Sequence, residues 1–250
     1  MKTPSAELKR IARENLNGKY GVAILVMITA SLIPSALLYP FAENARHGGA
    51  SQRIIYYLAS IIITVIQLLL TCGQLRLHLN IATRQPYQFS DIFFSFRRHP
   101  QKILGAYLLF VLYMIPAVLP GSVLLTFALL LFTDSAPFIG LTVIVLGAGI
   151  IFDIRIALQC SLVFFMLVDN PYASIRGTFR RSKELMEGNK LRLLYLQLSF
   201  LCFYLLAVLS CGIGLLWLMP YMQQTMVCFY LVVQVVKGAA HSCFASAMCS

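Results

Sequence analysis

The chain alternates between long apolar stretches and short polar segments. A helix needs about 20 apolar residues to cross the hydrocarbon core of a bilayer. Stretches of about that length or longer cover residues 21–41, 54–79, 103–132, 138–168, 193–211 and 215–236. The pattern therefore predicts an all-α fold, a polytopic transmembrane helix bundle of about six spans within residues 21–237, with interfacial amphipathic helices at its surface.

The third stretch, residues 103–132, contains internal helix breakers. Pro116 and the pair Pro120-Gly121 interrupt its apolar run. Proline removes a backbone hydrogen bond and bends a helix, so one tilted or kinked helix accommodates the extra length. The ends of this span and of the next, residues 138–168, are left open by the pattern.

Three polar segments carry apolar residues at helical spacing, as helices at a membrane surface do. The first, residues 1–20, is basic, and its apolar face comprises Leu8, Ile11, Ala12 and Leu16. The other two lie within residues 80–102 and 169–192. We expect the first to lie on the inner membrane surface and the others to be interfacial, with a solvated connecting helix as the alternative.

The charge distribution favours one orientation. The chain has 20 Lys and Arg residues against 9 Asp and Glu residues, a net charge of +11. Most of the basic residues fall before the first span or within 80–102 and 169–192, and basic loops stay on the cytoplasmic side. We therefore expect both chain ends inside, a short cytoplasmic tail over 238–250, and anionic lipid headgroups as partners instead of nucleic acid.

Composition excludes an ordinary soluble domain. Hydrophobic residues make up 59% of the chain and charged residues 12%, against roughly 45–50% and 25% in soluble proteins. The sequence has no zinc-protease, nucleophile-elbow or phosphate-loop motif, and its seven cysteines form no C-x-x-C pair. The four histidines are far apart at segment ends, where we expect them to be solvated or interfacial. We expect no catalytic, metal or cofactor site, and hence no enzyme.

Three polar residues within the stretch 138–168 form the candidate site. Asp153 and Arg155 are ionisable groups at membrane depth, which cost several kcal/mol unless paired or hydrated. Residues two apart on a helix point in nearly opposite directions, so these two cannot pair, whereas Arg155 and Gln159 share a face. A structural network or snorkelling is one interpretation, and a solute or proton path is the other.

A set of residues in the second half of the chain resembles a known family. The residues that carry the resemblance include Asp169, Asn170, Pro171, Ser182, Gly188, Pro220 and Tyr221. They resemble a bacterial integral membrane family catalogued as domain of unknown function 975, most specifically over residues 169–230. Where that family tends to have glycine and tryptophan, this chain has Cys202 and Phe203. The resemblance implies a bacterial multi-pass membrane protein and names no activity.

The leading hypothesis is a multi-pass protein of the bacterial cytoplasmic membrane without enzymatic activity. It would act through lipid or membrane-protein partners at its three basic segments. The alternative is a small-solute transporter, or a subunit of one, that uses Asp153 and Arg155. The oligomeric state stays open.

Overall fold

The computed structural model describes residues 5–98, 100–131, 136–210 and 212–248; within its helices the side chains of 117–122, 124–125, 127–131, 136–139, 141–142 and 238–248 are not described. The described residues form helices joined by short connections, which confirms the all-α fold. In chain order the helices are α1 (Ser5–Leu16), α2 (Tyr20–His47), α3 (Ala50–Ala82), η1 (Phe89–Phe93), α4 (Phe94–Arg97), α5 (Pro100–Leu131), α6 (Ala136–Cys160), α7 (Val163–Asp169), α8 (Ile175–Met186), α9 (Lys190–Leu209) and α10 (Leu215–Met248).

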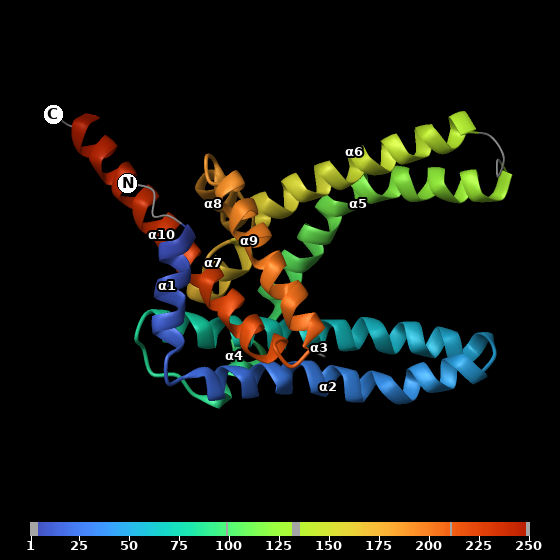
Figure 1. The fold of residues 1–250 in the computed structure, drawn as a ribbon, viewed down its shortest axis with the longest axis horizontal. Helices are drawn as coiled ribbons and strands as arrows, with labels where there is room; N and C mark the ends of the chain where they lie inside the picture. The colour runs from blue at the N-terminus through green and yellow to red at the C-terminus, as the bar shows by residue number, and fades with distance from the viewer. Residues whose placement is uncertain (1–4, 99, 132–135, 211, 249–250) are drawn as a thin grey trace.

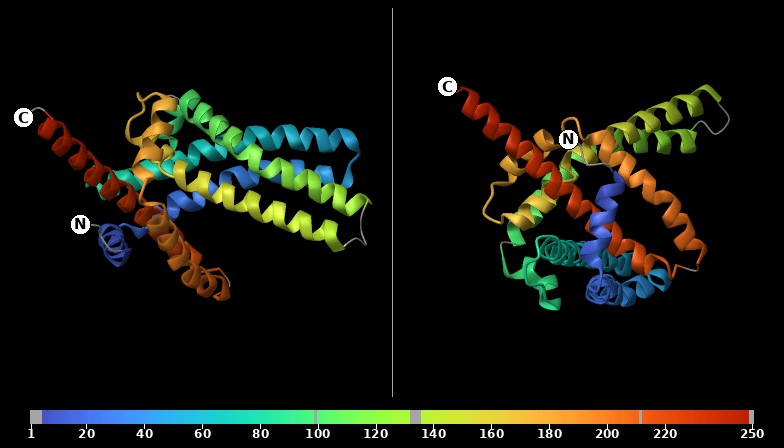
Figure 2. Two further views of the ribbon diagram at one scale, coloured as in Figure 1. Left: turned by 90° about the horizontal axis from the view of Figure 1, so that it is seen from above. Right: turned by 60° about the vertical axis from the view of Figure 1, so that its left-hand side comes forward.

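Three helical hairpins, α2–α3, α5–α6 and α9–α10, meet in a common centre (Figure 1). The first two extend in the same direction, as the view from above shows in Figure 2. Helices α1 and α8 and the C-terminal end of α10 lie away from the turns of these two hairpins. The polar segments that contain α1 and α8 therefore lie at the end of the molecule opposite these two turns.

Five helical segments in the described part of the chain are long and apolar enough to cross a membrane. They are Tyr20–His47, Ala50–Ala82, Val143–Asp169, Lys190–Leu209 and Leu215–Lys237. The remaining expected span, 103–132, corresponds to α5, which bends partway along in Figure 1. Its described apolar segment, Pro100–Pro116, is too short to count as a span, so six as the total stays a prediction.

The expected span 138–168 is two helices instead of one. A turn at residues 161–162 separates α6 from α7. The Ser161 hydroxyl donates a hydrogen bond to the Leu158 carbonyl oxygen at 2.9 Å. The same bond occurs at Ser60 and Ser199 within the unbroken helices α3 and α9, so it does not by itself account for this break, which apolar composition does not predict.

The expected amphipathic helix of residues 1–20 forms as α1, and protein covers its apolar face. Leu8, Ala12 and Leu16 are fully buried, and α1 packs mainly on α10 and also on α3. The apolar stripe contacts other apolar side chains of the bundle in place of lipid. Within the segment 80–102, the structure has the end of α3, then η1 and α4, and the start of α5, with Ile92 of η1 buried.

The centre of the molecule is densely packed. Phe229 and Tyr230 of α10 are its largest fully buried side chains. At Gly73 of α3, an added Cβ would overlap the Ile92 carbonyl, so only glycine permits the close approach of η1. The outer parts of the hairpins differ. Their large apolar side chains are exposed, among them Leu32, Leu58, Ile62, Leu112, Ile144 and Ile151.

Candidate functional site

Local sequence signals define the ends of α8. The Ser174 side chain accepts a hydrogen bond from the Gly177 N–H at 3.2 Å, a capping contact that begins the helix. Gly188 follows the helix with φ +79°, a left-handed conformation that favours glycine at a helix C-terminus. The Ser182 hydroxyl donates to the Gln159 carbonyl oxygen at 2.6 Å and ties α8 to the last turn of α6.

The loop before α8 is also fixed by hydrogen bonds. Tyr230 of α10 donates its hydroxyl to Asp169 Oδ2 at 3.0 Å. The Asn170 side-chain oxygen accepts the backbone N–H two residues further on, at 3.2 Å. Lys102 Nζ at the start of α5 donates to the Pro171 carbonyl oxygen at 2.9 Å. The Asp169-Asn170-Pro171 motif thus positions α8 against its neighbours.

A cavity of about 640 Å³, here called the α8 groove, lies between α5, α6 and α8. Its lining residues are Leu109, Tyr113, Ile156, Gln159, Cys160, Arg176, Phe179, Arg180 and Lys183. The residues from α5 and α6 are apolar except for Gln159. Three of the four residues from α8 are cationic, so the groove has one apolar wall and one basic wall.

The basic wall has more positive charge than its acidic neighbours balance. Arg180 and Arg181 share Glu184, with N–O distances of 3.1 and 3.4 Å. The hydrogen bond from Arg180 holds the pKa of Glu184 below its usual value. Arg176 and Lys183 are exposed, and within the described ranges neither pairs with a carboxylate. The groove therefore has a net positive charge on its α8 side.

The three polar residues predicted from sequence do not form one cluster. Asp153 is half-buried, and in the described part of the chain its Oδ1 is buried without a hydrogen-bond partner. Arg155 is exposed on α6. Gln159 lines the groove beside the cations of α8. Of the three, only Gln159 is placed among the residues of this basic site.

The other motif residues anchor α1. Pro220 is buried within α10. The Tyr221 hydroxyl donates to the Lys9 carbonyl oxygen at 3.3 Å, and its ring packs edge-on against Phe200 at 5.5 Å between centroids. These contacts hold the amino-terminal helix on the α9–α10 hairpin.

A buried polar contact between α3 and α10 was not predicted from the sequence. The prediction of a solvated or interfacial His78 is wrong, because this side chain is only 2% exposed. Its Nδ1 lies 2.8 Å from Gln224 Oε1, and Gln223 Nε2 donates to Gln74 Oε1 at 3.3 Å. Glutamines within apolar runs were the available signal, since polar side chains join helices in membranes. No three His, Cys, Asp or Glu residues in the described ranges are placed to hold a metal ion.

The fold and its exposed apolar hairpins define the class, a helical integral membrane protein. The family model described as "Protein of unknown function (DUF975)" matches residues 1–237, so the chain belongs to this family. The resemblance identified from residues 169–230 is confirmed and extends over nearly the whole chain. Neither a curated protein nor a solved structure matches the chain.

Proposed function

We propose that this protein is a non-enzymatic membrane protein that binds anionic partners, lipid or protein, at its basic segments. The observation that carries the proposal is the α8 groove, where Arg176 and Lys183 adjoin an apolar wall. The proposed location is the cytoplasmic membrane of a bacterium, with both chain ends inside. The position of the basic segments between spans supports this orientation.

Charge repulsion within α8 supports an anionic partner. Arg176 and Arg180 are four residues apart, and Arg180 and Lys183 are three apart. Like charges at these spacings destabilise a helix. An anion in the groove relieves this repulsion, whereas a solvated helix leaves it in place.

The test is affinity purification of the tagged protein in native nanodiscs, with mass spectrometry of bound lipids and proteins. We expect the wild type to retain an anionic lipid or an acidic protein in stoichiometric amount, and Arg176→Gln/Lys183→Gln to lose it. Recovery of the same molecules in the same amounts with both forms would contradict the proposal.

Transport of a small solute is a second candidate function. It is favoured by one observation, the buried Asp153 Oδ1 without a hydrogen-bond partner in the described residues. Ionisable groups within membrane spans are costly and often belong to solute or proton paths, and Asp153 lies within a candidate span. We expect Asp153→Asn and Arg155→Met variants to fold and to lose uptake or export if this function holds. Unchanged transport in both variants would exclude it.

A further inference from the structure

We infer that the α8 groove holds one anionic phospholipid, with its phosphate against α8 and its acyl chains along α5 and α6. This inference rests on the proposed function, because it names the partner that occupies the same basic site. The phosphate end of the lipid would contact the basic wall of the groove, and its acyl chains would contact the apolar wall.

The basic wall suits a phosphate. At 3.6 residues per turn, Arg176, Arg180 and Lys183 fall within about 60° of one another around the helix axis. Guanidinium groups bind phosphate oxygens through paired N–H donors, and lysine adds a compact charge. Gln159 on α6 supplies a side-chain amide at the same groove. Together these residues place several donors around one anion.

The opposite wall suits an acyl chain. Leu109, Tyr113 and Ile156 line it, and the Tyr113 ring packs on Phe179 at 5.8 Å between centroids. Leu112, about one turn beyond Leu109 on α5, is 60% exposed, so the apolar wall continues into the exposed surface of the α5–α6 hairpin. An acyl chain that follows this surface stays within the bilayer.

Size and charge together favour a lipid over a free anion. A volume of about 640 Å³ lies within the usual range of small-molecule sites, and a free phosphate leaves most of it unfilled. A headgroup with the first part of its chains occupies both walls. Glu184 is the acidic group nearest the basic wall in α8, and its charge is already shared by two arginines. It therefore does little to repel an anionic headgroup.

Native mass spectrometry of the full-length, delipidated protein tests the inference. The protein is titrated with phosphatidylglycerol or phosphatidylcholine, and retained lipid is counted. We expect one phosphatidylglycerol to bind to the wild type in preference to phosphatidylcholine. For Arg176→Gln/Lys183→Gln we expect roughly thirtyfold weaker binding, the equivalent of about 2 kcal/mol for two charges at a membrane surface.

Two control variants make the result specific to the groove. Arg97→Gln/Arg98→Gln removes the same charge from another exposed basic segment, and we expect it to bind as the wild type does. Lys183→Arg keeps the charge and should also retain the lipid. Inorganic phosphate at equal concentration should not displace it, because phosphate cannot use the apolar wall.

The possible failures are distinguishable. Equal weakening in both double variants would show diffuse attraction to headgroups and overturn the groove site, while the proposed function would stand. Displacement by inorganic phosphate, or an acidic protein bound where phosphatidylglycerol is not, would also overturn the inference alone. If neither lipid nor protein binds, the inference and the proposed function both fail.

Discussion

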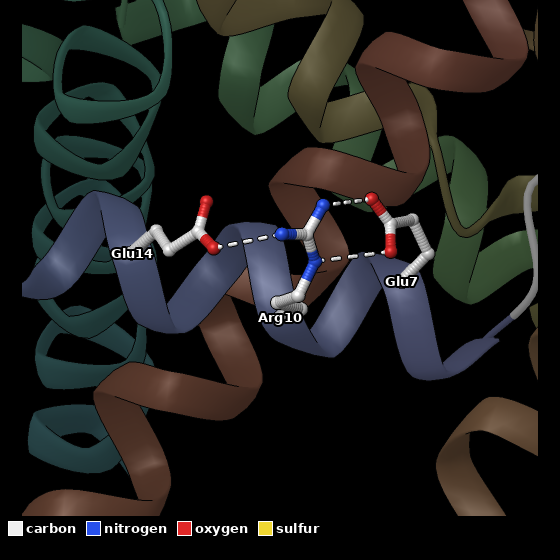
Figure 3. A network of polar contacts seen from close by, with 3 residues as sticks. All are labelled: Glu7, Arg10 and Glu14. Atoms are coloured by element: carbon white, nitrogen blue, oxygen red, sulfur yellow. Dashed lines mark hydrogen bonds and ion pairs between the residues drawn. The ribbon is translucent and has the colours of Figure 1, made fainter.

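Helices α1 and α8 are alike in length, charge and amphipathic pattern but differ in their surroundings. Each has 12 residues, is basic and amphipathic, and buries an apolar face in the bundle. In α1 each cation has a partner, since Arg10 lies between Glu7 and Glu14 and bonds to both (Figure 3), and Arg13 lies 5.9 Å from the centroid of the Tyr221 ring. Lys9 lies 4.3 Å from the centroid of the Phe200 ring.

In α8 the positive charges are not all paired. Glu184 serves two arginines, and within the described residues Arg176 and Lys183 have no acidic partner. An apolar wall from α5 and α6 also lies beside these cations. The comparison shows that a basic amphipathic pattern alone does not predict how the cations of a docked helix are partnered. Under the proposed function, this difference separates a helix that binds an anion from one that is only structural.

The largest expected effect comes from removing a buried contact of α1. Leu16→Ala should lower the free energy of unfolding by about 2–5 kcal/mol, because a fully buried leucine leaves a cavity. Thermal unfolding in detergent measures the loss. The matched control is Leu191→Ala in α9, where the side chain is 80% exposed. Equal losses in detergent would mean that α1 is not docked as described.

The second prediction, with a smaller effect, concerns the change in Tm that lipid binding at α8 should cause. Phosphatidylglycerol should raise the Tm of the wild type, since a ligand that binds the folded state stabilises it. Arg176→Gln/Lys183→Gln should unfold at or slightly above the wild-type Tm without lipid, because repulsion within α8 is relieved, and should lose most of this increase. Arg10→Gln/Arg13→Gln, which removes the same charge from α1, should keep the lipid response. Loss of the response in the α1 variant instead would reverse the roles assigned to the two helices.

A smaller effect is expected for the cation of α1 that lies over aromatic rings. Lys9 Nζ is 4.3 Å and 5.3 Å from the ring centroids of Phe200 and Phe203. Lys9→Met keeps the apolar stem and removes the charge, so the stability loss should be about 0.5–1 kcal/mol. Thermal unfolding of Lys183→Met, an exposed position of α8, provides the control and should show no loss without lipid. A similar loss at both positions would remove this difference between the helices.

The smallest effect concerns pH, where the two helices should behave alike. Hydrogen bonds from Arg10 and Arg180 hold the pKa of Glu7 and of Glu184 below the ordinary value of about 4.5. A carboxyl group with a lowered folded pKa stabilises the protein above its unfolded pKa, and this contribution is lost as pH falls through the folded value. Below about pH 4.5, unfolding temperatures of wild type and Glu7→Gln should therefore converge.

The Glu184→Gln variant should follow the same course as Glu7→Gln. Above pH 5 both variants should unfold at slightly lower temperature than the wild type, and the difference should shrink with added salt because these side chains are solvent-exposed pairs. A difference that persists undiminished at pH 3 would contradict the ion-pair explanation for that helix.

The sequence predicted the elements of this fold better than their contacts. Apolar runs of bilayer length identified α2, α3, α9 and α10, since length and hydropathy are local properties. The turn between α6 and α7 interrupts a continuous apolar run, so such a pattern does not reveal it. Periodicity likewise identified the apolar face of α1, but it does not say whether lipid or protein covers that face.

The candidate site was predictable only in part. Gln159 was singled out for its spacing from Arg155, yet the structure places it beside Arg176 and Lys183 of α8. That juxtaposition depends on the Ser182 bond to α6 and on the loop at Asp169-Asn170-Pro171, which are tertiary contacts. The family resemblance identified these residues, and the structure gives them a physical role.

Site-specific fluorescence quenching tests most directly whether the α8 groove selects an anionic lipid. The natural tryptophan is replaced by Trp217→Phe, and Tyr113→Trp places a fluorophore in the groove. In mixed vesicles, brominated phosphatidylglycerol should quench this fluorophore at a lower mole fraction than brominated phosphatidylcholine does. When Arg176→Gln and Lys183→Gln are introduced into the same variant, the two brominated lipids should quench the fluorophore equally. Equal quenching by the two lipids, with and without these two substitutions, would contradict the account.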